Sequence, residues 1–308
     1  MKVLFISSGN KKDGISAVVY NQGESLKNAG IEIEYYLITG KGFIGYLSHL
    51  IPLRKKIFSQ NYDVLHAHYS YCGFLTALAS PGSKIIVSLM GSFYKNTIKY
   101  FLIHFFTKFI WESVIVKSDK MRTQINLKNA YLIPNGVDLS RYSNLPPREI
   151  IRKELDFYPE NKYIIFVSDP DRPEKNFKLA NETVLSLKDE NIKLIPVFNK
   201  TPELVSKFQI AADVLILTSF TEGSPNVIKE AMAACCPIVC TNVGDVEYVI
   251  GDADGCFVTD NNIENLSSAL VKALKFGKRT NGIARIKKHG LDTNNISEKI
   301  IKLYNKND

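Results

Sequence analysis

Short apolar runs alternate along the chain with longer segments whose apolar residues recur at helical spacing. The apolar runs, which this pattern predicts to be strands, lie at 3–7, 31–38, 63–68, 84–89, 114–116, 130–133, 163–168, 193–198, 213–218 and 238–241. The segments at helical spacing lie at 16–28, 46–59, 71–79, 98–109, 177–189, 202–210, 226–234, 262–276 and 296–305. Strands that alternate with helices form parallel sheets covered by helices, so the predicted fold class is α/β.

One stretch interrupts this alternation. Between residues 134 and 147, prolines and polar residues replace the periodic pattern, and this composition is typical of a linker. It predicts a first domain over 1–145 and a second over 146–295. A chain of 308 residues is long enough for each domain to bury a core of its own.

Composition limits the cellular setting. No run of about 20 uncharged apolar residues occurs, so no segment is expected to span a bilayer. The first eight residues are too short for a signal peptide and are interpreted as a strand. The five cysteines are odd in number and lack C-x2-C pairs, so we expect free thiols in a cytoplasmic protein and no zinc site.

The excess of positive charge lies in the first half. Residues 1–145 hold 17 Lys and Arg against 8 Asp and Glu (+9), and the remainder holds 22 against 23 (−1). Such a half is able to attract an anionic membrane surface or an acidic acceptor, although a solvated lysine-rich surface explains it equally well. No nucleic-acid-binding motif accompanies the charge, so nucleic acid is not an expected partner. The aromatic helix at 98–109 is interpreted as core, with attachment to a membrane surface as the alternative.

The segment 221–232 carries the clearest chemistry. Glycine, serine and proline join the strand at 213–218 to a helix, whose first N–H groups and positive dipole end favour an anion. Glu222 and Glu230 bracket this turn, and carboxylates accept hydrogen bonds from sugar hydroxyls. Ordinary helix capping is the alternative. Phosphate and polyol together suggest a nucleotide sugar, with the backbone of the turn as its anion site: Gly223, Ser224, Asn226 and Val227.

Three motifs together resemble one family. Glu222 and Glu230 enclose seven residues and resemble the E-x7-E signature of retaining glycosyltransferases of the GT-B superfamily, family four (glycosyl transferases group 1). Residues 133–138, Ile-Pro-Asn-Gly-Val-Asp, resemble the segment that closes the first domain in that family. Residues 166–176 are similar to its strand and basic loop that open the second domain.

The resemblance implies a GT-B fold, in which two doubly wound Rossmann-like domains face each other across a cleft and a final helix, here 296–308, packs back on the first domain. It implies retaining transfer of a sugar from a nucleoside diphosphate sugar, with a uridine-linked donor expected, to a glycan or lipid-linked acceptor in polysaccharide or glycolipid biosynthesis. The enzyme would be cytoplasmic or peripheral at the inner face of the membrane.

The resemblance also assigns roles on the donor side. Lys175 would neutralise the leaving diphosphate with help from Arg172, although relatives usually place the arginine nearer the strand end. Glu230 would accept hydrogen bonds from the ribose, and Glu222 from the transferred sugar. With no obvious carboxylate nucleophile, front-side attack is implied. Gly14, on a loop, would let a ligand approach the backbone closely.

On the acceptor side, His66 and His68 lie at the exit of the strand at 63–68, in a segment similar to one that lines the cleft in the family; a structural role for either is an open alternative. Met90, before Gly91 and Ser92, stands where many relatives have a histidine, so sugar choice or activity is expected to differ. An Asp-Pro-Asp triplet at 169–171 superficially resembles a metal motif of another fold, but Lys175 and the helix end already supply positive charge. No metal or other cofactor is expected.

Two other functions are compatible with the same motifs. The departures at Met90 and Arg172 also suit a donor-binding partner subunit that is catalytically silent. A nucleotide-sugar epimerase on the same fold would convert the donor without any acceptor.

Overall fold

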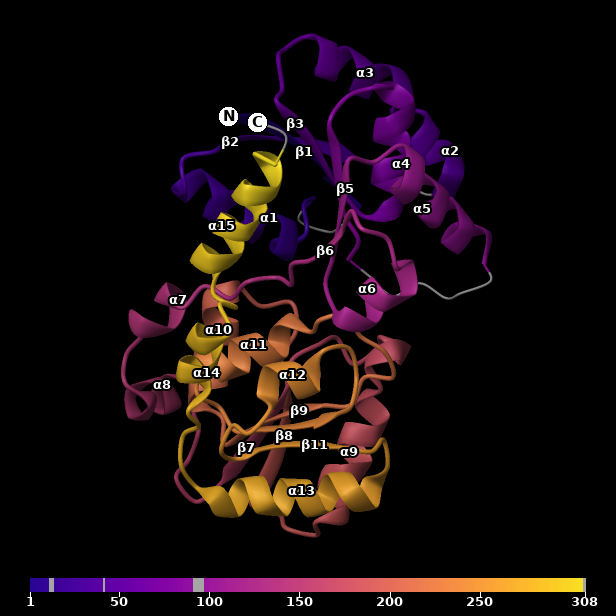
Figure 1. The fold of residues 1–308 in the computed structure, drawn as a ribbon. Helices are drawn as coiled ribbons and strands as arrows, with labels where there is room; N and C mark the ends of the chain where they lie inside the picture. Colours follow the sequence, from indigo (N-terminus) through magenta and orange to yellow (C-terminus); the bar gives the residue numbers. More distant parts are fainter. Residues whose placement is uncertain (11–13, 41, 91–96, 307–308) are drawn as a thin grey trace. The chain divides into compact units, whose positions relative to one another are not determined.

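The computed structural model describes residues 1–10, 14–40, 42–90 and 97–306 of the chain, apart from the side chain of Phe43 (Figure 1). They divide into two compact units, Met1–Asn135 with Thr293–Asp308, and Gly136–Asp292. The division precedes the predicted boundary at 145 because Val137 and Tyr142 lie in the second core. The C-terminal segment from Thr293 belongs to the first unit.

The first unit is built on a parallel sheet of six strands in the order β2-β1-β3-β4-β5-β6. The chain leaves β1 toward β2 and then returns to place β3 on the other side of β1, which makes a topological switch point. Its strands are β1 Lys2–Ser8, β2 Glu32–Ile38, β3 Val64–His68, β4 Ile85–Ser88, β5 Ser113–Val116 and β6 Ala130–Leu132.

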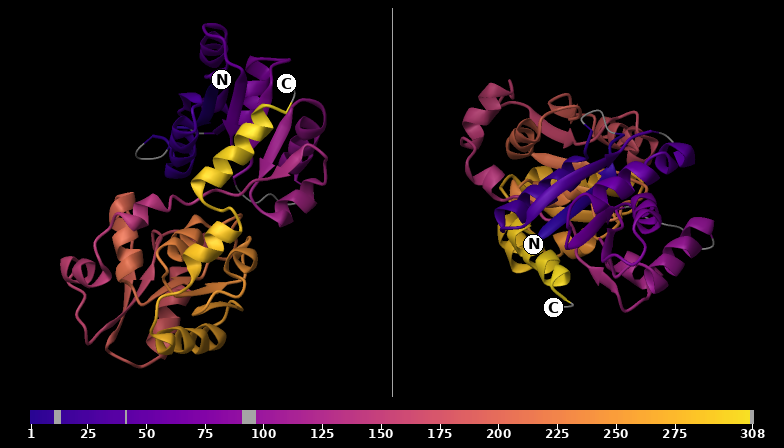
Figure 2. Two further views of the ribbon diagram at one scale, coloured as in Figure 1. Left: turned by 60° about the vertical axis from the view of Figure 1, so that its left-hand side comes forward. Right: turned by 90° about the horizontal axis from the view of Figure 1, so that it is seen from above.

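Helices cover both faces of this sheet. Its helices are α1 Ala17–Asn28, α2 Gly42–Leu47, α3 Leu50–Phe58, α4 Ser70–Ala79, α5 Ile98–Phe109, α6 Asp119–Ile125 and α15 Thr293–Tyr304. One core joins the sheet to α3, α4, α5 and α6, and the other joins it to α1 and α15, which pack together although they are far apart in sequence (Figures 1 and 2). The helix predicted over 46–59 is two helices, α2 and α3, and α6 was not predicted.

Helix α5 is a core helix on one face only. Ile103 and Thr107 are buried, and Tyr100 and Phe106 pack against the same core, whereas Phe101, Phe105 and Phe109 are 62%, 51% and 64% exposed. The interpretation of α5 as core therefore holds for one face, and the other is an exposed apolar surface. Within the described residues no helix is both long and apolar enough to cross a bilayer.

The second unit repeats the architecture with five parallel strands in the order β11-β10-β9-β7-β8. The switch point here lies between β7 and β9. Its strands are β7 Lys162–Phe166, β8 Ile192–Pro196, β9 Val214–Leu217, β10 Ile238–Thr241 and β11 Cys256–Thr259. Its α-helices are α7 Ser140–Ser143, α8 Arg148–Glu154, α9 Phe177–Ser186, α10 Pro202–Ala211, α11 Asn226–Ala233, α12 Val246–Ile250, α13 Ile263–Phe276 and α14 Gly282–Lys288.

Helices α9 and α13 pack on one face of this sheet, and α11, α12 and α14 share a core on the other (Figure 1). The periodic pattern did not predict α7, α8, α12, β11 or α14. Most of these are short, and α7 lies inside the segment interpreted as linker.

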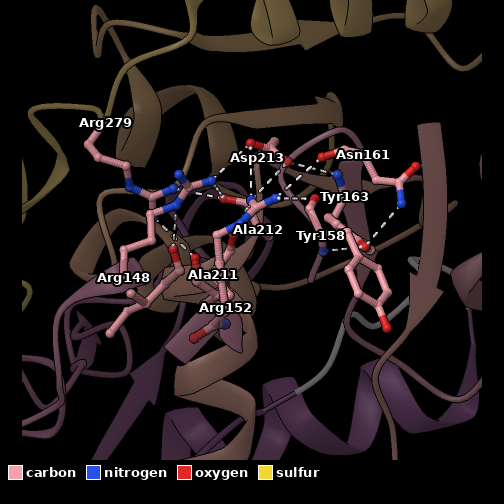
Figure 3. A network of polar contacts seen from close by, with 11 residues as sticks. Arg148, Arg152, Tyr158, Asn161, Tyr163, Ala211, Ala212, Asp213 and Arg279 are labelled. Carbon is pink, nitrogen blue, oxygen red and sulfur yellow. Dashed lines mark hydrogen bonds and ion pairs between the residues drawn. The ribbon is translucent and has the colours of Figure 1, made fainter. Parts of the chain in front are cut away.

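An arginine network fixes the amino end of β9. Asp213 accepts hydrogen bonds from Arg148 at 2.9 Å, from Arg152 at 3.3 Å and from the backbone N–H of Tyr163 at 2.8 Å (Figure 3). Arg279 donates to the carbonyl oxygen of Ala212 at 2.8 Å. These contacts join α8 and the segment before α14 to the sheet at the edge opposite the carboxyl ends of its strands, so their role is structural.

Candidate active site

Lys175 and Glu222 meet at the switch point of the second unit. Lys175 ends a 3-10 turn, Pro173–Lys175, in the loop after β7, and Glu222 follows β9. The Lys175 Nζ lies 2.5 Å from the Glu222 Oε1, and the two side chains are 17% and 15% exposed. The Ser219 hydroxyl donates to the same carboxylate oxygen at 2.8 Å. The structure therefore brings together two residues that were assigned to donor chemistry separately.

Backbone contacts hold both loops in place. The Thr218 hydroxyl, at the end of β9, donates to the carbonyl oxygens of Lys175 at 3.2 Å and of Asn176 at 2.9 Å. The N–H of Phe220 donates to the carbonyl oxygen of Glu174 at 3.0 Å. Because these bonds join the loop after β7 to the loop after β9, the Lys175–Glu222 pair is positioned by the sheet itself.

Arg172 is not part of the Lys175–Glu222 pair. Its guanidinium pairs with Glu174 at 2.5 Å, and the two side chains are 50% and 45% exposed. An exposed pair of this kind contributes little to stability. The role expected for Arg172, to assist Lys175, has no counterpart in its hydrogen bonds or ion pairs within the described residues.

A buried lysine supports the turn before α11. The Lys229 side chain is nearly inaccessible, and its Nζ donates to the Ser224 hydroxyl at 2.5 Å, which donates to the Asp245 carboxylate at 2.6 Å. Burial lowers the pKa of Lys229 and raises that of Asp245, and in each case the opposite charge of the partner opposes the shift. A Cβ on Gly244 would lie 2.7 Å from the Gly223 carbonyl oxygen, so only glycine allows this approach.

These contacts shape the turn that opens α11. Helix α11 begins after Pro225, and no side chain of the described residues caps it. Sequence reasoning missed Lys229 and Asp245. The available signal was a lysine inside an otherwise apolar helical stripe, directly before Glu230.

Glu230 lies in a separate set of contacts. Its Oε2 accepts a hydrogen bond from the Gln209 amide at 3.4 Å, and the Gln209 Oε1 accepts one from the Tyr142 hydroxyl at 2.8 Å. Burial raises the pKa of the Glu230 carboxyl, and the charge of Arg141 opposes this shift. Arg141 and Tyr142 follow the Ile-Pro-Asn-Gly-Val-Asp motif, which sequence reasoning used only as a domain marker.

The first unit has its own polar hollow, at the carboxyl ends of β1, β3 and β4. Its volume is about 460 Å³, and Ser8, Asn10, Ser70 and Met90 are among its lining residues. Met90 lines this hollow, and its role toward a substrate stays a prediction. Gly91 and Ser92 fall outside the described residues. Gly14 has a φ of +77°, which glycine adopts without strain.

The prediction that His68 lines a cleft was wrong. His66 and His68 are both fully buried and stack at 4.4 Å between ring centroids. His66 bonds the Tyr304 hydroxyl at 2.5 Å and the Ser88 hydroxyl at 2.9 Å, whereas within the described residues neither nitrogen of His68 has a hydrogen-bond partner. Burial lowers the pKa of His66 to about 3 and that of His68 well below its usual value. Both histidines belong to the core between β3 and α15.

No group of three or more His, Cys, Asp or Glu side chains in the described part of the chain is arranged to hold a metal ion. The positive charge next to Glu222 comes from Lys175.

Comparison with known proteins identifies the family of the chain. Residues 12–141 match the model of Glycosyltransferase Family 4, and residues 161–275 match that of Glycosyl transferases group 1. A putative teichuronic acid biosynthesis glycosyltransferase, TuaC, of Bacillus subtilis is 25% identical, with 68% of this chain and 61% of that protein covered. The E. coli UDP-Gal:alpha-D-GlcNAc-diphosphoundecaprenol alpha-1,3-galactosyltransferase is 22% identical, with 73% and 70% covered.

Solved structures share the whole fold. HepE of Anabaena in complex with UDP superimposes with a TM-score of 0.77 at 16% identity, and 99% of this chain and 100% of that chain are covered. WaaG, a glycosyltransferase involved in lipopolysaccharide biosynthesis, gives 0.72 at 16% identity, with 98% and 99% covered. The fold is GT-B, and the chain belongs to glycosyltransferase family four.

Proposed function

We propose that the protein is a retaining glycosyltransferase that moves a sugar from a UDP-sugar to a glycan or lipid-linked acceptor without a metal ion. The observation that carries this proposal is the Lys175–Glu222 pair, at a switch point and on the same loop as the turn that opens α11. Ligands of open parallel sheets bind beyond the carboxyl ends of the strands at such a point.

The donor would be held by the second unit. The Lys175 ammonium and the amino end of α11 would stabilise the diphosphate, whose charge grows as the glycosidic bond breaks. Glu222 would then accept hydrogen bonds from the transferred sugar, and Glu230 from the ribose. Uridine as the base is supported by two similar proteins, HepE in complex with UDP and a galactosyltransferase whose name specifies UDP-galactose.

Transfer would proceed by front-side attack. The acceptor hydroxyl oxygen forms a bond to the anomeric carbon on the face from which the diphosphate oxygen departs, so the configuration is kept. The acceptor proton passes to the departing phosphate oxygen, and the electron pair of the broken bond stays with the diphosphate. Lys175 supplies the positive charge that this oxygen needs.

The first unit would also contact a membrane. Phe101, Phe105 and Phe109 expose aromatic rings on α5, and Lys108 lies on the same helix. An amphipathic surface of this kind binds the boundary between head groups and acyl chains. Flotation of the chain with phosphatidylglycerol vesicles, but not with phosphatidylcholine vesicles, would support this contact.

The decisive experiment combines binding with product analysis. A thermal-shift screen of nucleotide sugars identifies the donor, because a ligand of the folded state raises apparent stability. The released nucleotide and the product's anomeric configuration are then measured with candidate acceptors. Inversion of configuration would reject the retaining mechanism. Binding without turnover would indicate a silent partner subunit, and conversion of the donor without acceptor an epimerase.

A further inference from the structure

An apolar groove lies between α2, α4 and α5 of the first unit. Its volume is about 770 Å³, within the range of small-molecule sites. Aliphatic and aromatic side chains form most of its wall, including Leu47, Phe74, Leu78, Ile98, Leu102 and Phe106. Leu78 and Leu102 are 58% and 43% exposed, so the groove is open to a ligand.

The groove is continuous with the polar hollow at the carboxyl ends of β1, β3 and β4. Tyr46, Tyr71 and Lys99 line both spaces. The Lys99 Nζ lies 5.2 Å from the centre of the Tyr71 ring, so a cation stands at the junction. A molecule that fills both spaces would have a hydrocarbon part, an anionic group beside Lys99 and a polar part beyond it.

The composition of the helices around the groove also suits a molecule with a hydrocarbon part and an anionic group. The helices that form the groove, α2, α4 and α5, contain no Asp or Glu. The wall is therefore apolar, and Lys99 is the charged residue among the described residues that line it. This charge complements a phosphate ester and opposes entry of an acidic peptide.

We propose that the groove binds the first isoprene units of an acceptor linked to a polyisoprenyl diphosphate. Its diphosphate would lie beside Lys99, and its sugar in the polar hollow. This inference rests on the proposed transferase function, for which it names the acceptor class. A bilayer surface would instead use the outward rings of Phe101, Phe105 and Phe109, which are not among the residues that line the groove.

The single tryptophan of the chain reports on the groove. Trp111 is 3% exposed, and its ring centroid lies 5.3 Å from that of Phe74 and 5.4 Å from that of Phe106. Phe74 and Phe106 both line the groove. A ligand that moves either ring changes the environment of Trp111, so its fluorescence measures occupancy.

The test is a fluorescence titration of the full chain with farnesyl diphosphate, below its micelle concentration and without membranes. We expect a saturable change, at least tenfold weaker binding in Leu102→Asp, and unchanged binding in Phe105→Asp, a matched control that is 51% exposed on the same helix. Inorganic pyrophosphate should bind much more weakly than farnesyl diphosphate in the same fluorescence titration. UDP binding, followed by thermal shift, should be the same in all three proteins.

Absence of a saturable change with farnesyl diphosphate, or equal weakening in Leu102→Asp and Phe105→Asp, would overturn the proposal. A response to phosphatidylglycerol vesicles alone that Phe105→Asp removes would assign the surface to a bilayer instead. Failure of UDP and UDP-sugars to bind the wild-type chain would reject the transferase function, whether or not farnesyl diphosphate binds, so the two failures are distinguishable.

Discussion

The Lys175 ammonium and the Glu222 carboxylate, 2.5 Å apart, join the loop after β7 to the loop after β9. The two charges neutralise each other in the ligand-free chain. A diphosphate beside Lys175 adds negative charge and competes for the ammonium, while sugar hydroxyls offer Glu222 new donors. The pair is a structural link, and under the proposed function it would also be a preformed contact for the two ends of a sugar phosphate.

Replacement of Lys175 by Met should lower kcat by about 100-fold or more, because the leaving diphosphate loses its cation. Glu222→Gln should lower kcat less and should raise KM for the UDP-sugar, since an amide still accepts one hydrogen bond. Steady-state kinetics with the donor found by thermal shift measure both effects.

The double variant Lys175→Met/Glu222→Gln separates catalysis from stability. If the pair were only structural, the double variant would regain both the activity and the stability that each single variant loses. We expect stability to recover and kcat to remain low. Asp213→Asn is a control at the opposite end of β9, and it should lower the free energy of unfolding without changing kcat of the folded enzyme.

Donor binding should depend on the ionisation of Glu230. Burial raises the pKa of this carboxyl, so the free protein loses the carboxylate at a higher pH than an ordinary glutamate does. If the ribose needs the carboxylate, affinity for UDP falls as the pH drops through this raised pKa, and binding releases protons. Calorimetric titrations of UDP in buffers of different ionisation enthalpy measure the release. Glu230→Gln should bind more weakly and lose this dependence; an unchanged pH profile in that variant would contradict the assignment.

Lys229→Met should destabilise the second unit by about 3 kcal/mol, because Asp245 is left without its buried cation. It should also raise the donor KM, since Ser224 loses a contact that orients the turn. Adding Asp245→Asn should recover most of the stability and little of the donor affinity. Urea unfolding and kinetics of the two variants decide this, and full recovery of affinity would show that Lys229 is only structural.

Sequence periodicity predicted most of the strands and the parallel architecture because buried strands are short, apolar and separated by amphipathic helices. On α5 the core interpretation was right for one face only, because composition alone does not tell a fully buried helix from a surface helix with an exposed apolar face. Periodicity failed on α7, because a four-residue helix has no measurable period.

The site was predictable only where a motif placed it. Lys175 and Glu222 came from two separate motifs, and parallel pairing of β7 with β9 brings them together. Gln209 and Arg141 reach Glu230 from α10 and α7, which no local pattern connects. The prediction for His68 was wrong because the sequence shows that the residue lies at the carboxyl end of a strand. It does not show whether the side chain faces the core or the hollow.

Stability of the first unit should fall with acid below pH 6.5. Burial holds the pKa of His66 at about 3, with the Lys117 charge adding to the shift, and burial lowers that of His68 in the same direction. An unfolded histidine titrates near pH 6.5, so between these values the unfolded chain binds protons that the folded chain does not. Each histidine then lowers the free energy of unfolding by up to about 1.4 kcal/mol for each unit that the pH falls, and neither contributes above pH 7.5.

Urea unfolding at pH 7.5, 6.5 and 5.5, followed by Trp111 fluorescence, should show this fall in the free energy of unfolding. His68→Leu should reduce the dependence on pH by about half. Equal slopes in the two proteins would mean that His68 is charged or hydrated in the folded state.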